Sequence, residues 1–170
     1  EAVLRANPSD NPIFATMTAS GNDVFLSSAN TRQFRLSAKG LPVTEAIERS
    51  AVFGNGTERD EVRARLKAYL SGAAGTPENL YMQDYAASNA RWFENVDAFR
   101  AATSGAAGLS TAFPDTALGG KMKAIAETIA VRTSLNMNRQ IFYATVGGFD
   151  THSNQVDELP ALHAEIAGAV

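Results

Sequence analysis

The sequence predicts an α/β fold that is rich in helix and has few, short strands. Its 170 residues are 45% hydrophobic and 19% charged, the balance of a globular domain with a sizeable core. Amphipathic stretches with a helical period fill the middle and the end of the chain, and short β-favouring apolar runs stand near its start and after residue 140. We expect residues 1–170 to form a single α/β domain or an internal segment of a larger domain.

Composition excludes several classes of function. The formal net charge is −3 and no basic block is present, so nucleic acid is not expected as a partner. No apolar run approaches the ~20 residues of a membrane span, so we expect no transmembrane segment. Cysteine is absent, which excludes disulfides and thiolate metal sites, and imidazole chemistry is limited to His152 and His163.

The first part of the chain predicts short extended elements. Ile13–Thr18 reads as a strand, and Ser20–Asp23 as a plain turn. Val24–Leu26 fits either a second extended piece or a short helical turn. Phe34–Ser37 alternates between apolar and polar residues, as a strand should.

A helical region follows. Pro42–Phe53 is a candidate short helix, ended by a Gly-Asn-Gly sequence. Thr57 is a good N-cap, with Asp60 at the capping-box position, and the helix that it starts should stop near Gly72.

A second, longer helix is predicted from the Thr76-Pro77-Glu78 start signal. Its expected buried face consists of Tyr81, Tyr85, Trp92, Val96 and Phe99. We interpret this aromatic stripe as core packing rather than as a cofactor site. The helical region 57–112 is also a candidate insertion that binds a partner, and exposure of the stripe would favour that hypothesis.

Two more helices are predicted in the last third of the chain. The first covers about 118–135, and its apolar face consists of Leu118, Met122, Ile125, Ile129 and Ala130. The inward positions of the last helix are Leu159, Leu162, Ile166 and Val170. Pro160 should lie in its first turn, because a proline deeper in a helix removes a backbone hydrogen bond.

The stretch most suggestive of chemistry lies between these helices. Gln140–Val146 reads as a buried, central strand, and two glycines follow it. Asp150 and His152 come next, and Ser153 or Asn154 could start the last helix. Ligands of open α/β sheets bind at the carboxyl ends of strands, so this is where we expect a site.

Three roles are open for Asp150 and His152. They could bind one metal ion or two neighbouring ions, since carboxylate and imidazole are both metal ligands. They could act as a general acid and base. They could also simply pair with each other and with loop N–H groups. His163 is expected to be a surface or boundary residue of the last helix.

Two segments carry a resemblance to a known family. Lys123–Tyr143, followed by the string Gly-Gly-Phe-Asp-Thr-His-Ser-Asn-Gln at 147–155, resembles the bacterial DUF1501 family. Its members have no assigned activity, and many carry a twin-arginine export signal. The resemblance is good over roughly 118–157 and loose before that.

The resemblance implies a fold and a function. The family is thought to be similar to the alkaline phosphatase and sulfatase superfamily, with a three-layer α/β/α fold. It therefore implies that Asp150 and His152 bind a divalent metal (Zn, Mn, Mg or Ca) in an exported or periplasmic hydrolase-like protein that acts on a small phosphate or sulfate ester. No nucleophile is assigned, so enzymatic activity stays open.

Two further expectations accompany the resemblance. The alternative function is a non-catalytic binding or structural protein of the bacterial envelope with the same fold. Few strands are present for an α/β sheet, so we also expect the missing flanks of a longer parent chain to supply the rest of the sheet.

Overall fold

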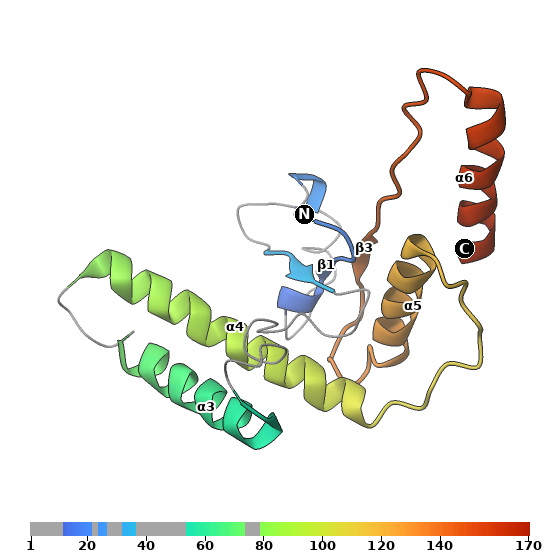
Figure 1. Ribbon diagram of the computed structural model, residues 1–170. Coiled ribbons are helices and arrows are strands. Elements are labelled where there is room, and N and C mark those ends of the chain that lie inside the picture. Colours follow the sequence, from blue (N-terminus) through green and yellow to red (C-terminus); the bar gives the residue numbers. More distant parts are fainter. Residues whose placement is uncertain (1–11, 22–23, 27–31, 37–53, 74–78) are drawn as a thin grey trace. The chain divides into compact units, whose positions relative to one another are not determined.

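The computed structural model is helix-rich and contains a small parallel sheet, which confirms the predicted α/β class (Figure 1). The structure describes residues 12–21, 24–26, 32–36, 54–73 and 79–170. Two compact units are present: unit 1 comprises Glu1–Leu41 and Ala102–Val170, and unit 2 comprises Pro42–Ala101. The predicted helix over Pro42–Phe53 and the start signal at 76–78 lie outside the described residues.

The sheet of unit 1 has three parallel strands in the order β2-β1-β3. They are β1 (Thr16–Thr18), β2 (Phe34–Arg35) and β3 (Ile141–Tyr143). Both predicted N-terminal strands and the strand after residue 140 are therefore present, although each is shorter than its apolar run.

The central position in this sheet belongs to β1 rather than to β3. Thr16, Met17 and Thr18 are all buried, whereas the three residues of β3 are half-buried. The sequence-based prediction of a buried central strand at 140–146 is wrong in this respect. Strand β1 has a hydrogen-bonded neighbour on each side in the described sheet, and β3 pairs with β1 alone there.

Short 3₁₀ helices flank β1. Pro12–Phe14 forms η1, so the first half of the predicted strand is a helical turn, and Val24–Leu26 forms η2, which selects the helical alternative. The rings of Phe14 and Phe34 are fully buried and meet edge to face, with centroids 5.0 Å apart. Such aromatic pairs stabilise a core beyond the area that they bury.

Unit 2 is an antiparallel helical hairpin of α3 (Gly56–Ala73) and α4 (Leu80–Ser104), whose last three residues belong to unit 1 (Figure 1). Its core consists of Leu66, Leu70, Ala86, Ala90 and Phe93. The leucines of α3 pack against the alanines and the phenylalanine of α4 at that point.

A charged cluster extends the hairpin contact. The carboxylate of Asp97 on α4 accepts hydrogen bonds from Arg63 at 2.5 Å and from Lys67 at 2.9 Å, both on α3. The Arg63 guanidinium also lies over the Phe93 ring, 5.4 Å from its centroid. Partial burial raises the pKa of Asp97, whereas the hydrogen bonds from Lys67 and Arg63 and the positive charges of these two residues lower it. The lowering effects are larger, so the pKa of Asp97 lies below its ordinary value.

The helix caps of unit 2 differ from the predicted ones. At α3 the side chain of Asn55 accepts from the backbone N–H groups of Thr57 (3.0 Å) and Glu58 (3.3 Å), and Glu58 accepts from the Asn55 N–H (2.7 Å). This is a capping box two residues before the predicted Thr57/Asp60 pair. At α4 the cap is Asn79, whose side chain accepts from the N–H groups of the second and third helical residues.

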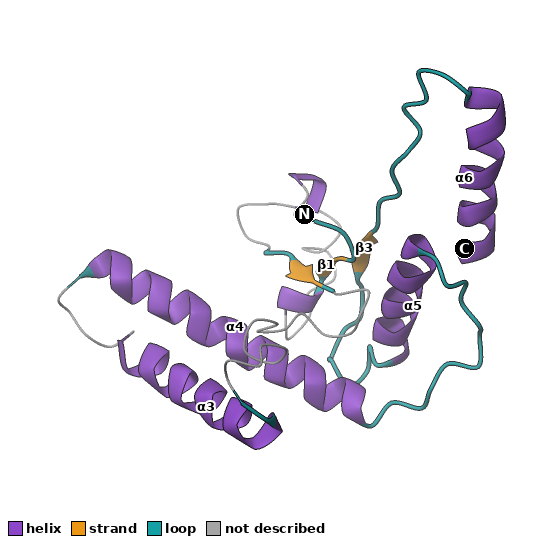
Figure 2. Cartoon of the chain, viewed as in Figure 1, coloured by secondary structure: helices purple, strands orange, loops and turns teal. Residues whose placement is uncertain are grey.

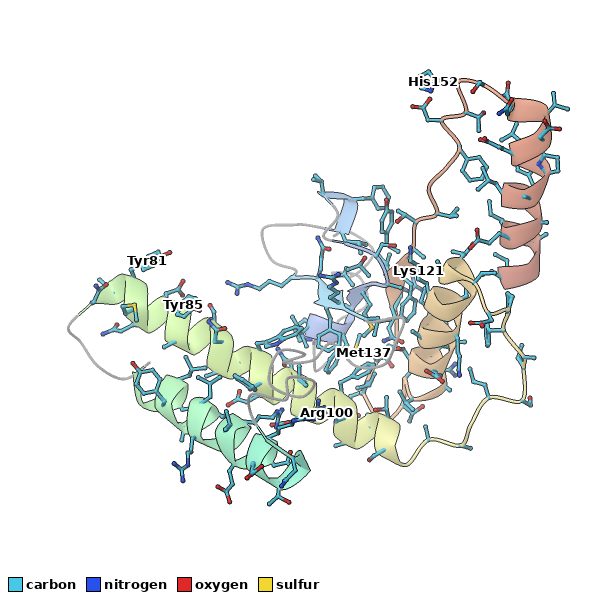
Figure 3. The ribbon with its side chains drawn as sticks, viewed as in Figure 1. Tyr81, Tyr85, Arg100, Lys121, Met137 and His152 are labelled. Atoms are coloured by element: carbon cyan, nitrogen blue, oxygen red, sulfur yellow. The ribbon has the colours of Figure 1, made fainter. Side chains whose placement is uncertain are left out.

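The predicted aromatic face of α4 is wrong over its first half. The buried residues are Ala86, Ala90, Phe93, Val96 and Phe99. Tyr81 is 80% exposed and Tyr85 is 56% exposed, and Figure 3 shows both at the beginning of α4. The hairpin partner covers the side of α4 that carries Ala86, Ala90 and Phe93.

Helices α5 (Ala117–Ala130) and α6 (Gln155–Ala169) pack together in unit 1 (Figure 1). The Thr116 hydroxyl caps α5 by accepting from the Gly119 N–H at 3.0 Å, and Glu165 on α6 accepts from the Leu118 N–H at 3.2 Å. A carboxylate at a helix N-terminus is electrostatically favourable.

Three details of these helices correct the predictions. Helix α5 ends at Ala130 rather than at 135, and turns follow it. Asn136 is left-handed (φ 54°), and the Met137 N–H donates to the Arg132 carbonyl, a pattern typical of helix ends. Pro160 is the sixth residue of α6, past its first turn. Among the expected inward residues, Ile129, Ala130 and Val170 are exposed.

Candidate functional site

The predicted site lies on the long loop that connects β3 to α6, drawn in teal in Figure 2. Gly148 has a φ of +95°, and a Cβ there would come within 3.2 Å of Leu162 on α6. The ring of Phe149 lies 5.9 Å from that of His163, also on α6. The glycine and the phenylalanine therefore hold the middle of the loop against α6.

Asp150 and His152 follow this anchored point and contact each other. His152 Nδ1 lies 3.3 Å from Asp150 Oδ1 and 3.3 Å from the Asp150 carbonyl oxygen. Both side chains are largely in solvent, with exposed fractions of 92% for Asp150 and 81% for His152. Their pairing matches one of the three roles considered for them.

The pair does not lie at the end of the strand, where it was expected. Strand β3 ends at Tyr143, and Asp150 follows seven residues later. Figure 3 shows His152 at the far end of the loop, well separated from Lys121 on α5. The loop carries the acid and the imidazole away from the sheet instead of presenting them at its edge.

The chemistry of the pair suits a divalent metal, but the number of ligands is small. A carboxylate oxygen and an imidazole nitrogen are both ligands that bind Zn²⁺ and Mn²⁺. Among the described residues, no cluster of three or more His, Cys, Asp or Glu side chains is placed to hold an ion. The pair fits part of a metal site, and further ligands would have to come from elsewhere.

The start of α6 explains the geometry just after the pair. Asn154, one of the two residues considered for the start of this helix, is the N-cap residue, but it is left-handed (φ 59°) and its side chain makes no capping bond. Its carbonyl accepts from the N–H groups of Asp157 and Glu158 at 3.0 Å. The acids of the first turn face the positive end of the helix dipole.

A second polar group occupies the carboxyl edge of the sheet, and the sequence-based interpretation missed it. The Ser20 hydroxyl, just past β1, accepts from the Thr145 N–H at 2.8 Å and from the Thr145 hydroxyl at 2.9 Å. The Lys121 ammonium on α5 donates to the Thr145 carbonyl at 2.5 Å. We call Ser20, Lys121 and Thr145 the edge cluster.

The signal for the edge cluster in the sequence is faint. Each member is a common residue in an ordinary context: a turn, a helix and the end of a strand. Only the pairing of β1 with β3 brings together residues that are 125 positions apart. His163 is exposed on α6, as predicted, and its ring contacts Phe149.

Comparison with models of known protein families, with curated proteins and with solved structures gave no match. No described helix combines the length and the apolar character that crossing a bilayer requires.

Proposed function

We propose that Asp150 and His152 supply two ligands of a divalent metal site in an exported, hydrolase-like protein that acts on phosphate or sulfate esters. The observation that carries the proposal is their geometry: the carboxylate and the imidazole lie 3.3 Å apart and are almost fully exposed. Side chains this close can approach one ion with small changes of rotamer. The resemblance of the surrounding sequence to the DUF1501 family supports the ester class.

The contact also suggests how His152 is used. The ring nitrogen that faces the Asp150 carboxylate is Nδ1, so an ion bound by both side chains would lie between them, with Nδ1 and a carboxylate oxygen as its ligand atoms. A bound metal ion would polarise an ester oxygen and lower the pKa of a coordinated water.

Metal content tests this proposal directly. Tag-free protein is dialysed against Zn²⁺ or Mn²⁺, and bound metal is measured by mass spectrometry. The Asp150→Ala/His152→Ala variant should bind at least about tenfold more weakly while its circular dichroism stays unchanged, because two ligands are lost. His163→Phe, which removes the other imidazole and keeps an aromatic ring beside Phe149, should leave metal binding unchanged. Equal metal uptake by the double variant and the parent would exclude the metal role.

Activity is measured on the same samples. Hydrolysis of an aryl phosphate or an aryl sulfate that is lost in the double variant, and kept in His163→Phe, would support the hydrolase-like function. Metal binding without turnover of either ester would support a metal-binding protein without this activity.

A second candidate is the non-catalytic binding protein, and one observation favours it. The first residues of α4 expose a set of apolar side chains. This apolar surface consists of Leu80, Tyr81, Met82 and Tyr85. Exposed tyrosines are typical of surfaces that bind other proteins. Exposure was the outcome expected of the stripe if the helical region binds a partner, and it holds for Tyr81 and Tyr85 but not for Val96 and Phe99, which are buried.

A second copy of the chain is the simplest partner, because a two-fold axis would bring the same apolar surface of each copy together. Sedimentation of the parent protein should then show a dimer at high concentration. Tyr81→Ser/Tyr85→Ser should shift the equilibrium to monomer, whereas Arg91→Gln, an exposed change on the same helix, should not. A parent that stays monomeric at every concentration would exclude this partner.

A further inference from the structure

The edge cluster lies at the point of the sheet where the strand order reverses. From β1 the chain passes to β2 on one side, and it later returns to β3 on the other side. In parallel sheets, ligands bind outside the carboxyl ends of strands at such a reversal of strand order. Ser20 follows β1 and Thr145 follows β3, so both residues stand at that point.

The hydrogen bonds of the cluster leave donors available. The Ser20 oxygen accepts both hydrogen bonds from Thr145, so its own O–H is not used in either. Lys121 has three N–H donors, and one of them bonds to the Thr145 carbonyl. Thr145 thus contacts both the Ser20 hydroxyl and the Lys121 ammonium.

We propose that Ser20, Lys121 and Thr145 form a binding site for a tetrahedral oxyanion, phosphate or sulfate, at the carboxyl edge of β1 and β3. Lys121 supplies the positive charge and Ser20 a hydroxyl donor, while Thr145 holds the two in place. The hydrogen bonds of the cluster lie at the surface, so an anion can reach them from solvent.

The N-terminus of α5 does not compete for this anion. Its Leu118 N–H donates to the Glu165 carboxylate, and its Gly119 N–H donates to the Thr116 hydroxyl. These donors are already used within unit 1. The anion is therefore assigned to the lysine and the serine rather than to the helix dipole.

The site does not depend on the proposed metal ligands. Asp150 and His152 belong to the far end of the loop, and no described hydrogen bond or ion pair links them to the edge cluster. Loss of metal binding and loss of anion binding are therefore separable outcomes.

Titration with inorganic phosphate and with sulfate, followed by nuclear magnetic resonance at constant ionic strength, tests the proposal. The parent should show saturable shifts at Ser20, Thr145 and the neighbouring amides. Lys121→Gln should weaken binding about tenfold or more, since a charge-assisted hydrogen bond is lost. Ser20→Ala should weaken it roughly threefold, as expected for a neutral hydrogen bond.

Matched variants distinguish anion binding at a specific site from nonspecific electrostatic attraction of anions to the protein. Lys123→Gln removes a lysine from the same helix that is 57% exposed and lies 3.9 Å from Glu127, and it should change binding by less than about twofold. Lys121→Arg keeps the charge and should retain most of the affinity. Asp150→Ala/His152→Ala should bind the anion as the parent does.

Two results would overturn the proposal. One is the absence of saturable shifts in the parent, which would mean that these hydrogen bonds only tie the two loops together. The other is an equal loss in Lys121→Gln and Lys123→Gln, which would mean nonspecific screening. If Lys121→Gln does not fold, Ser20→Ala and Lys121→Arg decide the question.

A phenyl phosphate titration identifies the source of the anion. Tighter binding of the ester than of inorganic phosphate would support an ester headgroup as the ligand. Equal binding would support the free ion as the ligand of the same site.

Discussion

The contacts within unit 1 differ in kind from the contacts within unit 2. The hairpin of unit 2 joins α3 to the next helix in the chain, for example through Arg63 and Asp97. The sheet of unit 1 joins β1 to a strand more than a hundred residues later, where the Ile141 N–H donates to the Ala15 carbonyl. Contacts that are distant in sequence carry a larger loop-closure cost, so unit 1 depends more on its buried residues.

The largest expected effects come from the two cores. Phe34→Ala in unit 1 and Phe93→Ala in unit 2 should each cost about 3–5 kcal/mol of unfolding free energy, because both rings are buried. Trp92, the single tryptophan, lies in unit 2, so its fluorescence follows that unit. We expect Phe93→Ala to lower the fluorescence midpoint and Phe34→Ala to leave it unchanged. Equal shifts in both variants would show that the two units unfold as one.

Two helical glycines of unit 1 should respond in opposite directions. A Cβ on Gly119 would lie 2.1 Å from the Pro114 carbonyl oxygen, whereas a Cβ on Gly168 would meet nothing within 4 Å. Gly119→Ala should destabilise unit 1 by about 1–3 kcal/mol through this overlap. Gly168→Ala should stabilise it by up to about 1 kcal/mol, because alanine favours the helix. Thermal unfolding measures both, and destabilisation by Gly168→Ala would contradict the open space around it.

The cap of α3 gives a smaller effect in unit 2. Asn55→Ala removes the side-chain acceptor for two backbone N–H groups and should cost about 1 kcal/mol. Thr57→Ala, at the position that the sequence had suggested, should change stability by less than about 0.5 kcal/mol. Denaturant unfolding followed at Trp92 compares the two. A larger loss of stability in Thr57→Ala than in Asn55→Ala would show that Thr57 is the cap, as the sequence had suggested.

The smallest expected effect concerns pH. The pKa of Asp97 is lowered in the folded protein, so its ion pairs stabilise the fold at pH values above the ordinary pKa of an aspartate. This stabilisation is lost as the pH falls through the lowered pKa. The side chain is 37% exposed, so solvent screening limits the contribution to about 0.5 kcal/mol. Asp97→Asn should therefore lower the unfolding free energy at pH 7 and leave it nearly unchanged in strong acid. A difference that is independent of pH would argue against the ion pairs.

The sequence alone determined the α/β class and the presence of most elements. Apolar periodicity identified α3, α4, α5 and α6, and β-favouring runs identified all three described strands. These signals are local, since each depends on a few neighbouring residues. The boundaries were less accurate, because more than one polar residue could serve as a cap: Asn55 and Thr57 lie two residues apart, and only Asn55 accepts from the N–H groups of α3.

Only the tertiary structure decided which faces are buried and which polar groups meet. Tyr81 and Tyr85 have the spacing of a core face, yet the hairpin covers the alanine face of α4. Asp150 and His152 are as close as their spacing suggested, but the loop carries them past the sheet edge. Ser20, Lys121 and Thr145 are common residues without a motif, and they meet because β1 pairs with β3. Strand pairing and helix packing depend on residues far apart in the chain, and no local pattern encodes them.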